Sequence, residues 1–355
     1  MLGYCTNVHS GDCFEDVITN LKTYSCRVQQ NLQTQLGVGL WLSEKASREV
    51  DISLLVDTLQ EGNLQVFTLN GFPFSNFHQD VVKHDVYKPD WSEESRLSYT
   101  VRLAQILSTI TKQEEAGIST LPLGWNSETF TNEDCAQQLL LCVEALEEIE
   151  QQTNKCIHID IETEPGCRLQ RSKDLCEFFE KHFGDDHRAR RYIRVCHDTC
   201  HAAVMRETAD VCVANYNNAG LRIGKVQLSS AIEFNLEATT NYSFIRNEQK
   251  YLHQTTIETP DGILFFENFS DITNHLQEGN CRVHFHVPIH QEFFGELQTT
   301  QHDLLASIPI LQKAGATDWE VETYTWSVTP SVLQDGELVN SVTKELAWAS
   351  KHLNK

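Results

Sequence analysis

The sequence predicts an α/β protein that folds as a closed (β/α)8 barrel. Short apolar runs with two-residue alternation are followed by stretches whose apolar residues recur every three or four positions, which is the pattern of strand and then helix. This alternation repeats along most of the 355 residues and favours parallel strands joined by helical crossovers. The chain contains no Gly-x-Gly-x-x-Gly or Walker loop. Because these loops are absent, the sequence favours the barrel over the main alternative fold, an open doubly wound sheet.

The chain offers nine strand candidates, one more than the barrel needs. They are residues 2–7, 37–42, 64–69, 118–124, 156–162, 192–196, 223–228, 282–287 and 319–325. Any of the stretches 118–124, 223–228 and 282–287 could lie outside the barrel. From periodicity alone these three alternatives stay open.

Helical spacing follows most of these strands. The expected helices cover residues 14–33, 48–60, 97–110, 132–152, 173–182, 202–217, 301–314 and 341–352. The strongest is 132–152, because Thr131 or Asn132 can cap its first turn. Residues 237–279 are less regular, and we expect an inserted hairpin or loops there, before a helix near Ile272. We expect a single domain over residues 1–355, closed by the C-terminal helix.

The amino-acid composition limits the classes of partner that we expect this protein to bind. The chain has 28 Lys and Arg against 50 Asp and Glu, a net charge of −22. This charge argues against nucleic acid or an anionic membrane as the main partner, and favours a metal ion or a neutral or cationic ligand. The chain shows no signal peptide and no apolar stretch long enough to insert into a membrane. The 12 cysteines form no Cys-x-x-Cys pair, which indicates reduced thiols and a cytoplasmic protein.

One acidic strand is central to the functional interpretation. In residues 156–162, isoleucines alternate with His158, Asp160 and Glu162, and the strand ends in Glu164-Pro165-Gly166. Acidic groups that face a barrel interior are costly unless they are paired, protonated or bound to a metal.

Other strand ends carry similar groups. These are Asp198 and His201, Gln227, His284 and His286, and Glu320 and Glu322. Catalytic groups of such barrels lie where strands run into the following loops, so these residues are expected to converge at one mouth. Carboxylates, imidazoles and an amide oxygen suit one divalent ion such as Mn²⁺, Co²⁺, Zn²⁺ or Mg²⁺. Carboxylates crowd together only when a cation or a proton offsets their repulsion.

The series Glu…Asp-x-x-His…His…Glu on the late strands resembles the xylose-isomerase-like superfamily of sugar isomerases, epimerases and endonuclease-IV-type enzymes. Several longer runs resemble, more narrowly, the EboE-type metabolite traffic proteins, which are associated with moving a prenylated or indolic precursor. These runs are Gly3-Tyr-Cys-Thr-Asn-Val-His9, Asn70-Gly-Phe-Pro-Phe74, Asp198-Thr-Cys-His201, Gly224-Lys-Val-Gln-Leu-Ser-Ser230, Arg282-Val-His-Phe-His-Val-Pro288 and Glu320-Val-Glu-Thr-Tyr-Thr-Trp326. The likeness covers nearly the whole chain and implies the barrel and a metal.

The resemblance also implies roles for individual residues. Glu162, Asp198 and Glu322 match metal ligands, and Glu162 and Glu322 match a catalytic pair that moves a proton next to a carbonyl. The fourth ligand is either Gln227, by its spacing after Asp198, or His286, by its His-x-His strand. Further residues are expected to bind substrate or to support the ligands: His9, Asn70, Glu164, His201, His284 and Glu320.

Less polar parts of the site are also expected. Phe72, Phe74 and Trp326 could pack against a less polar ligand, and residues 74–94 form a loop long enough to act as a lid.

Three functions fit these features. The first is a divalent-metal-dependent isomerase or epimerase of a sugar-like molecule in a secondary-metabolite pathway. The second is a metabolite-binding or traffic protein on the same barrel, without turnover. The third is a metal-dependent hydrolase of the endonuclease-IV kind, which needs three metals and a basic rim, and the net charge of −22 counts against it.

Overall fold

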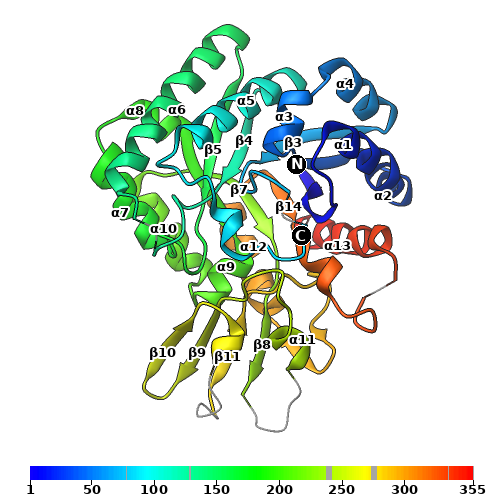
Figure 1. Ribbon diagram of the computed structural model, residues 1–355, viewed down its shortest axis with the longest axis vertical. Helices are drawn as coiled ribbons and strands as arrows, with labels where there is room; N and C mark the ends of the chain where they lie inside the picture. The colour runs from blue at the N-terminus through cyan, green and yellow to red at the C-terminus, as the bar shows by residue number, and fades with distance from the viewer. Residues whose placement is uncertain (77, 128, 237–241, 273–277, 335, 355) are drawn as a thin grey trace.

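A computed structural model describes the chain except for residues 77, 128, 237–241, 273–277, 335 and 355. Its central element is a closed barrel of parallel strands (Figure 1). These strands are β1 (Leu2–Cys5), β2 (Leu36–Trp41), β3 (Leu64–Asn70), β4 (Glu115–Thr120), β5 (Cys156–Glu162), β6 (Ile193–Asp198), β7 (Ile223–Leu228) and β14 (Trp319–Val321). Their order around the barrel is β1-β14-β7-β6-β5-β4-β3-β2, which confirms the predicted (β/α)8 architecture.

Helices surround the barrel, much as the sequence predicted. They are α1 (Phe14–Asn20), α2 (Cys26–Leu32), α3 (Glu44–Glu49), α4 (Ile52–Glu61), α5 (Glu94–Ile110), α6 (Asn132–Thr153), α7 (Ser172–Phe183), α8 (His187–Tyr192), α9 (Thr199–Val204), α10 (Ala209–Ala219), α12 (Gln301–Lys313) and α13 (Leu338–Leu353). A short helix, α11 (Ser243–Arg246), lies instead beside β8 (Ile232–Asn235), away from the barrel (Figure 1). Of the helices in the described ranges, none is long and apolar enough to cross a membrane.

Some expected helices are interrupted. A π-helical turn, Leu21–Ser25, separates α1 from α2 within the expected helix 14–33. The expected helix 48–60 divides at Asp51, whose side chain accepts a hydrogen bond from the Leu54 amide and starts α4. The expected helix 202–217 divides near Arg206, which has a φ of 58° and so leaves the helical region.

The surplus strand lies in an insertion between β7 and α12. There the chain forms an antiparallel sheet in the order β10-β9-β11-β8-β13-β12. Its strands are β8 (Ile232–Asn235), β9 (Thr255–Thr259), β10 (Gly262–Phe266), β11 (Asn280–Val283), β12 (Phe293–Phe294) and β13 (Leu297–Thr299). The candidate strand 282–287 therefore lies outside the barrel, while 118–124 and 223–228 correspond to β4 and β7. The expected hairpin is β9–β10, and most of the helix expected near Ile272 falls outside the described residues.

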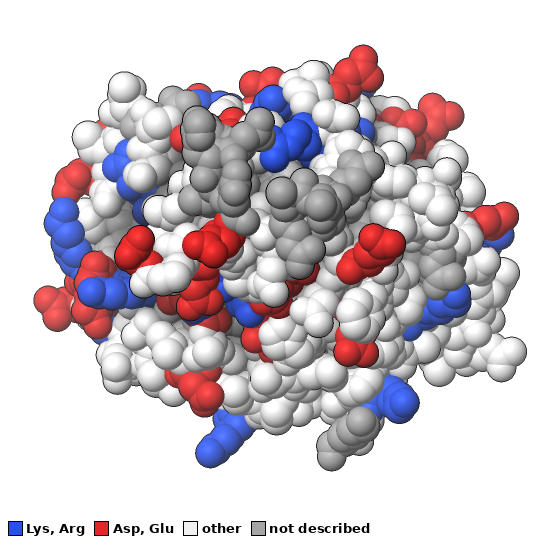
Figure 2. Space-filling view, turned by 90° about the horizontal axis from the view of Figure 1, so that it is seen from below, with Lys and Arg blue, Asp and Glu red and all other residues white. Residues whose placement is uncertain are grey.

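The inserted sheet has a hydrophobic cluster of its own. Ile257, Phe269, Val283 and Phe285 are fully buried in it. The sheet extends from one side of the barrel (Figure 1). Seen from below, single Lys and Arg side chains lie among acidic ones on a largely uncharged surface (Figure 2). With a second cluster present, a single domain over residues 1–355 stays a prediction.

The C-terminal helix α13 is tied to both sheets through Glu345. This buried carboxylate accepts hydrogen bonds from the Thr323 hydroxyl at 2.7 Å and from the Ile289 amide at 3.1 Å. Thr323 follows β14, and Ile289 belongs to the insertion. Burial raises the pKa of Glu345 from 4.5 to about 7, although both hydrogen bonds oppose the shift. The side chain is therefore stabilised in its neutral form.

We expect Glu345→Gln to change stability in a pH-dependent way. A raised carboxyl pKa adds stability below pH 4.5, and this contribution is lost as the pH rises through about 7. Relative to Glu345→Gln, the wild-type protein should lose about 2–3 kcal/mol of unfolding free energy between pH 5 and pH 8. Denaturant unfolding at the two pH values measures this. Glu177→Gln, at an exposed position, is the control. If wild type and Glu345→Gln differed in unfolding free energy by the same amount at both pH values, the raised pKa of Glu345 would be contradicted.

Candidate functional site

Three carboxylates meet at the carboxyl end of the barrel. Glu162 ends β5, Asp198 ends β6, and Glu322 follows β14 directly. Side chains alternate along a strand, so these positions point inward. One ligand oxygen of each lies within 4.8 Å of the others, and all three residues are buried.

Burial and mutual repulsion change the pKa values of these three carboxylates. Burial raises the pKa of Glu162 well above its usual value, and the charges of Glu322 and Asp198 add to the rise. Burial and the charge of Asp198 also raise the pKa of Glu322 well above its usual value. Burial also opposes ionisation of Asp198, but the nearby imidazoles His201 and His286 and two hydrogen bonds bring its pKa below the ordinary value. The three carboxylates therefore need bound protons or a cation to offset their mutual repulsion.

The hydrogen bonds of the cluster leave oxygen atoms for a cation. Asp198 Oδ1 accepts from the His201 amide at 2.8 Å and from the Ser229 hydroxyl at 2.7 Å. Its other oxygen, Oδ2, is buried and has no partner among the described residues. Glu322 Oε1 accepts from the side-chain amides of Asn7 at 2.7 Å and Asn70 at 3.2 Å. These donors orient the carboxylates, and the oxygen set fits a divalent metal ion.

Both candidates for the fourth ligand lie close by. The Gln227 side-chain oxygen accepts from the Cys196 thiol at 3.1 Å, and its side-chain nitrogen is buried without a partner in the described chain. His286 groups with Asp198 and His201, with ligand atoms within 4.8 Å of one another. The choice between Gln227 and His286 stays a prediction.

The inserted sheet delivers two histidines to the mouth. Beyond β11 the chain continues in an extended run, in which Phe285 and Val287 enter the insertion's hydrophobic cluster. His284 and His286 consequently point to the opposite face, toward the barrel. Burial and neighbouring imidazoles lower the pKa of His284 well below its usual value. Burial lowers that of His286 to about 4, so both rings are neutral at neutral pH.

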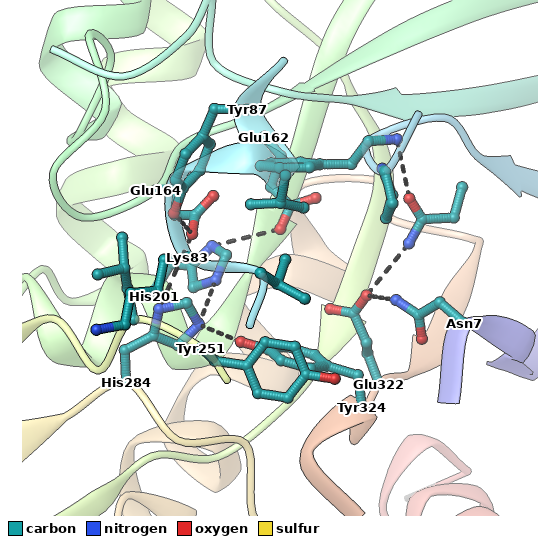
Figure 3. A pocket seen from close by; sticks show the side chains of 16 residues that line it. Asn7, Lys83, Tyr87, Glu162, Glu164, His201, Tyr251, His284, Glu322 and Tyr324 are labelled. Carbon is teal, nitrogen blue, oxygen red and sulfur yellow. Dashed lines mark hydrogen bonds and ion pairs between the residues drawn. The ribbon is translucent and has the colours of Figure 1, made fainter. Parts of the chain in front are cut away.

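A pocket of about 560 Å³, including space open to solvent, lies over these groups (Figure 3). Polar groups line its floor: Asn7, Asn70, Glu162, Glu164, His201, His284 and Glu322. Its walls are largely apolar or aromatic: Phe72, Pro73, Val82, Val86, Tyr87, Tyr251, Leu252 and Tyr324, with Lys83.

The loop expected to act as a lid does contribute to the pocket. Val82, Lys83, Val86 and Tyr87 come from it, the last three from a 3₁₀ helix, Lys83–Tyr87. The Tyr87 hydroxyl donates to Glu164 Oε1 at 2.8 Å. The loop therefore packs onto the acidic strand end, and its role as a lid stays a prediction.

Other predicted residues lie away from the pocket lining. His9 stacks on Tyr24 and forms a hydrogen bond with the Tyr4 hydroxyl. Phe74 packs against Tyr99, and Trp326 packs on the main hydrophobic cluster. Three aromatic residues were predicted to contact a less polar ligand, and of these Phe72 alone is among the described residues that line the pocket.

Glu320 lies in the layer beneath the carboxylates. It accepts from the Lys225 ammonium at 2.6 Å, and Lys225 also donates to the Ser119 hydroxyl at 2.9 Å. Lys225 and Glu320 are both fully buried inside the barrel. Lys225 was not among the predicted site residues, although its alternation with Gln227 on β7 places both on the inner face. The pocket residues Asn7, Tyr87 and Tyr324 were not predicted either, nor was Gln254, whose side-chain nitrogen donates to the Pro165 carbonyl at 3.1 Å. Of these, Asn7 and Tyr324 follow strand ends, which is a signal in the sequence.

We expect Lys225→Met to destabilise the fold, because it leaves Glu320 as an uncompensated buried charge. Removing one partner of a buried pair costs about 3–5 kcal/mol. Adding Glu320→Gln to this variant should recover much of the loss. Denaturant unfolding measures both variants, with Lys173→Met at an exposed position as the control. Equal stability of Lys225→Met and wild type would show that the pair contributes nothing.

The fold of this protein is similar to that of several proteins of known structure. No model of a protein family matches the sequence, and no curated protein matches it either. Solved structures do match. A D-allulose 3-epimerase from Methylomonas sp. has 11% identity and a TM-score of 0.55, over 99% of this chain and 97% of that one. A xylose isomerase-like TIM-barrel protein from Mycobacterium smegmatis in complex with magnesium has 7% identity and a TM-score of 0.54, over 99% and 96%.

A third structure, the IOLI protein with a bound zinc atom, has 10% identity and a TM-score of 0.53, over 99% of this chain and 98% of that one. The fold is thus that of the xylose isomerase-like barrels, whose members among these neighbours include an epimerase and metal-bound proteins. At such identities the likeness extends to the fold alone.

Proposed function

We propose that this protein is a divalent-metal-dependent isomerase or epimerase of a sugar-like molecule, acting in a secondary-metabolite pathway. The observation that carries the proposal is the convergence of Glu162, Asp198 and Glu322 at the barrel mouth, with ligand oxygens within 4.8 Å. The epimerase and the zinc- and magnesium-bound proteins among the structural neighbours support it.

The metal in this proposal is one Mn²⁺, Co²⁺, Zn²⁺ or Mg²⁺ ion held by Glu162, Asp198 and Glu322, with Gln227 or His286 in the fourth position. When bound, such an ion stabilises negative charge that develops on substrate oxygens. Asp198 contributes its buried Oδ2, which has no hydrogen-bond partner among the described residues. Asn7 and Asn70 hold Glu322 in place through its Oε1.

Glu162 and Glu322 move the proton. They project from β5 and from the end of β14, which β6 and β7 separate in the barrel, so the two carboxylates approach a ligand from different sides. One removes a proton from the carbon next to a carbonyl, and the other returns a proton to the neighbouring carbon or to the opposite face. A carboxylate positioned next to the reacting carbon can serve as a general acid or base.

The rest of the pocket positions the substrate. Asn70, Glu164 and His201 offer hydrogen bonds to hydroxyl groups on the pocket floor. Phe72, Tyr87 and Tyr251 present apolar surface opposite them, which suits a sugar-like molecule that carries a less polar substituent.

Proton exchange with solvent tests the proposal. Metal-loaded protein is incubated in heavy water with a panel of ketoses and keto-glycosides, and deuterium incorporation next to the carbonyl is followed by NMR. We expect exchange with at least one of these sugars. Glu162→Gln and Glu322→Gln should each reduce its rate by about 10²–10⁴-fold, the usual contribution of a general acid or base. Glu345→Gln, a buried carboxylate outside the pocket, should keep the wild-type rate.

A second candidate is a metabolite-binding or traffic protein of the EboE type. The apolar and aromatic walls of the pocket favour it. It predicts that prenylated or indolic molecules bind in the pocket, as measured by titration calorimetry, without deuterium exchange in any ligand. Absence of exchange across the sugar panel, together with such binding, would replace the first proposal with this one.

A further inference from the structure

One positively charged side chain lies in the wall of the pocket. Among the described residues that line it, Lys83 is the only lysine or arginine. Lys83 is half-buried, and its ammonium group forms no hydrogen bond or ion pair with any residue that the structure describes. The nearby Lys88 ammonium, in contrast, pairs with Asp90 at 2.7 Å. In a chain with 50 acidic and 28 basic residues, a half-buried lysine without an acidic partner is an exception.

The backbone holds Lys83 in an unusual conformation. Its φ is 40°, in the left-handed region that residues with a side chain rarely adopt. The amides of Val82 and Lys83 both donate to the Lys250 carbonyl oxygen, at 2.7 and 3.0 Å, and so impose this conformation. Strained backbone of this kind is concentrated at binding and catalytic sites.

The 3₁₀ helix that begins at Lys83 directs its side chain to the pocket. Residues three apart lie on the same side of a 3₁₀ helix, and Lys83 and Val86 both line the pocket. The rings of His84 and Tyr87 pack on Trp125, with ring centroids 4.8 and 5.0 Å apart. These contacts fix the helix, so Lys83 is a fixed part of the pocket wall.

The pocket floor limits where an acidic group of a ligand can lie. Glu162 and Glu322 repel an anion that approaches the floor. Figure 3 shows Lys83 on the side of the pocket that Glu164 occupies, away from Glu322. Glu164 accepts a hydrogen bond from the Tyr87 hydroxyl at 2.8 Å, and Lys83 does not pair with it. The Lys83 ammonium therefore remains available to an anionic group at the wall.

We propose that Lys83 binds an anionic group of the substrate, a phosphate ester or a carboxylate, and that the substrate is therefore an anionic sugar. The inference rests on the proposed function, because it takes the ligand to be sugar-like. A lysine ammonium is a compact point charge that binds either group. The net charge of −22 favours neutral or cationic ligands for the chain as a whole, and Lys83 reverses this preference locally.

Titration calorimetry with metal-loaded, full-length protein tests the inference. D-fructose is compared with D-fructose 6-phosphate and with D-fructuronate, which represent the neutral, phosphate and carboxylate ligands. The wild-type protein should bind one of the two anionic sugars about 10–100-fold more tightly than fructose, the usual effect of one hydrogen bond to a charged group. Lys83→Met should lose this preference, and Lys83→Arg should keep most of it. Lys112→Met, at an exposed position before β4 and at the opposite end of the barrel, is the matched control.

Phosphate and carboxylate groups also bind metal ions, and Lys83→Met distinguishes the two modes of binding. An anionic group held by the metal would keep its advantage in this variant, and that result would overturn the proposal. Equal binding of fructose and the anionic sugars by the wild-type protein, or no binding of either anionic sugar, would overturn it too. Circular dichroism checks that Lys83→Met folds, and Lys83→Gln replaces it if it does not.

Deuterium exchange in the same three sugars separates this inference from the proposed function. Binding of an anionic sugar that depends on Lys83, without exchange in any sugar, would count against the proposed function alone. Exchange in fructose, with no preference for the anionic sugars and no effect of Lys83→Met, would count against the present inference alone.

Discussion

Repulsion among buried groups at the barrel mouth is the constraint on which the rest of the site depends. Three carboxylates and three imidazoles share a space in which ligand atoms lie within a few Å of one another. Burial raises the pKa of Glu162 and of Glu322 well above the ordinary value. A protein tolerates such crowding where cations bind, because the attraction to the cation offsets both the repulsion and the cost of burial.

The surrounding structure holds these groups in place. Strand ends of the barrel fix the carboxylates, while Asn7 and Asn70 orient Glu322 from neighbouring elements. The inserted sheet adds His284 and His286, and its own hydrophobic cluster anchors the residues between and beyond them, Phe285 and Val287. The insertion therefore builds part of the site, and the barrel alone would lack two of the three imidazoles.

Sequence patterns predicted the barrel and most of the carboxylates, because alternation decides which face of a strand a side chain occupies. Glu162 and Asp198 were located in this way. Alternation also put His284 and His286 on one face, but it could not assign their strand to the inserted sheet. That assignment depends on antiparallel pairing of β11 with β8 and β9, contacts between residues distant in the chain. Tyr87 and Gln254 lie in irregular segments, where no periodicity indicates the direction of a side chain.

Thermal unfolding of metal-free protein, with and without added Mn²⁺, Co²⁺ or Zn²⁺, tests the central claim most directly. A ligand at a thousand times its dissociation constant stabilises the folded state by about 4 kcal/mol. If the mouth is a cation site, at least one of these ions or Mg²⁺ should raise the unfolding temperature by several degrees, and sodium chloride at the same ionic strength should raise it less. An unfolding temperature that none of the ions changes would contradict the account.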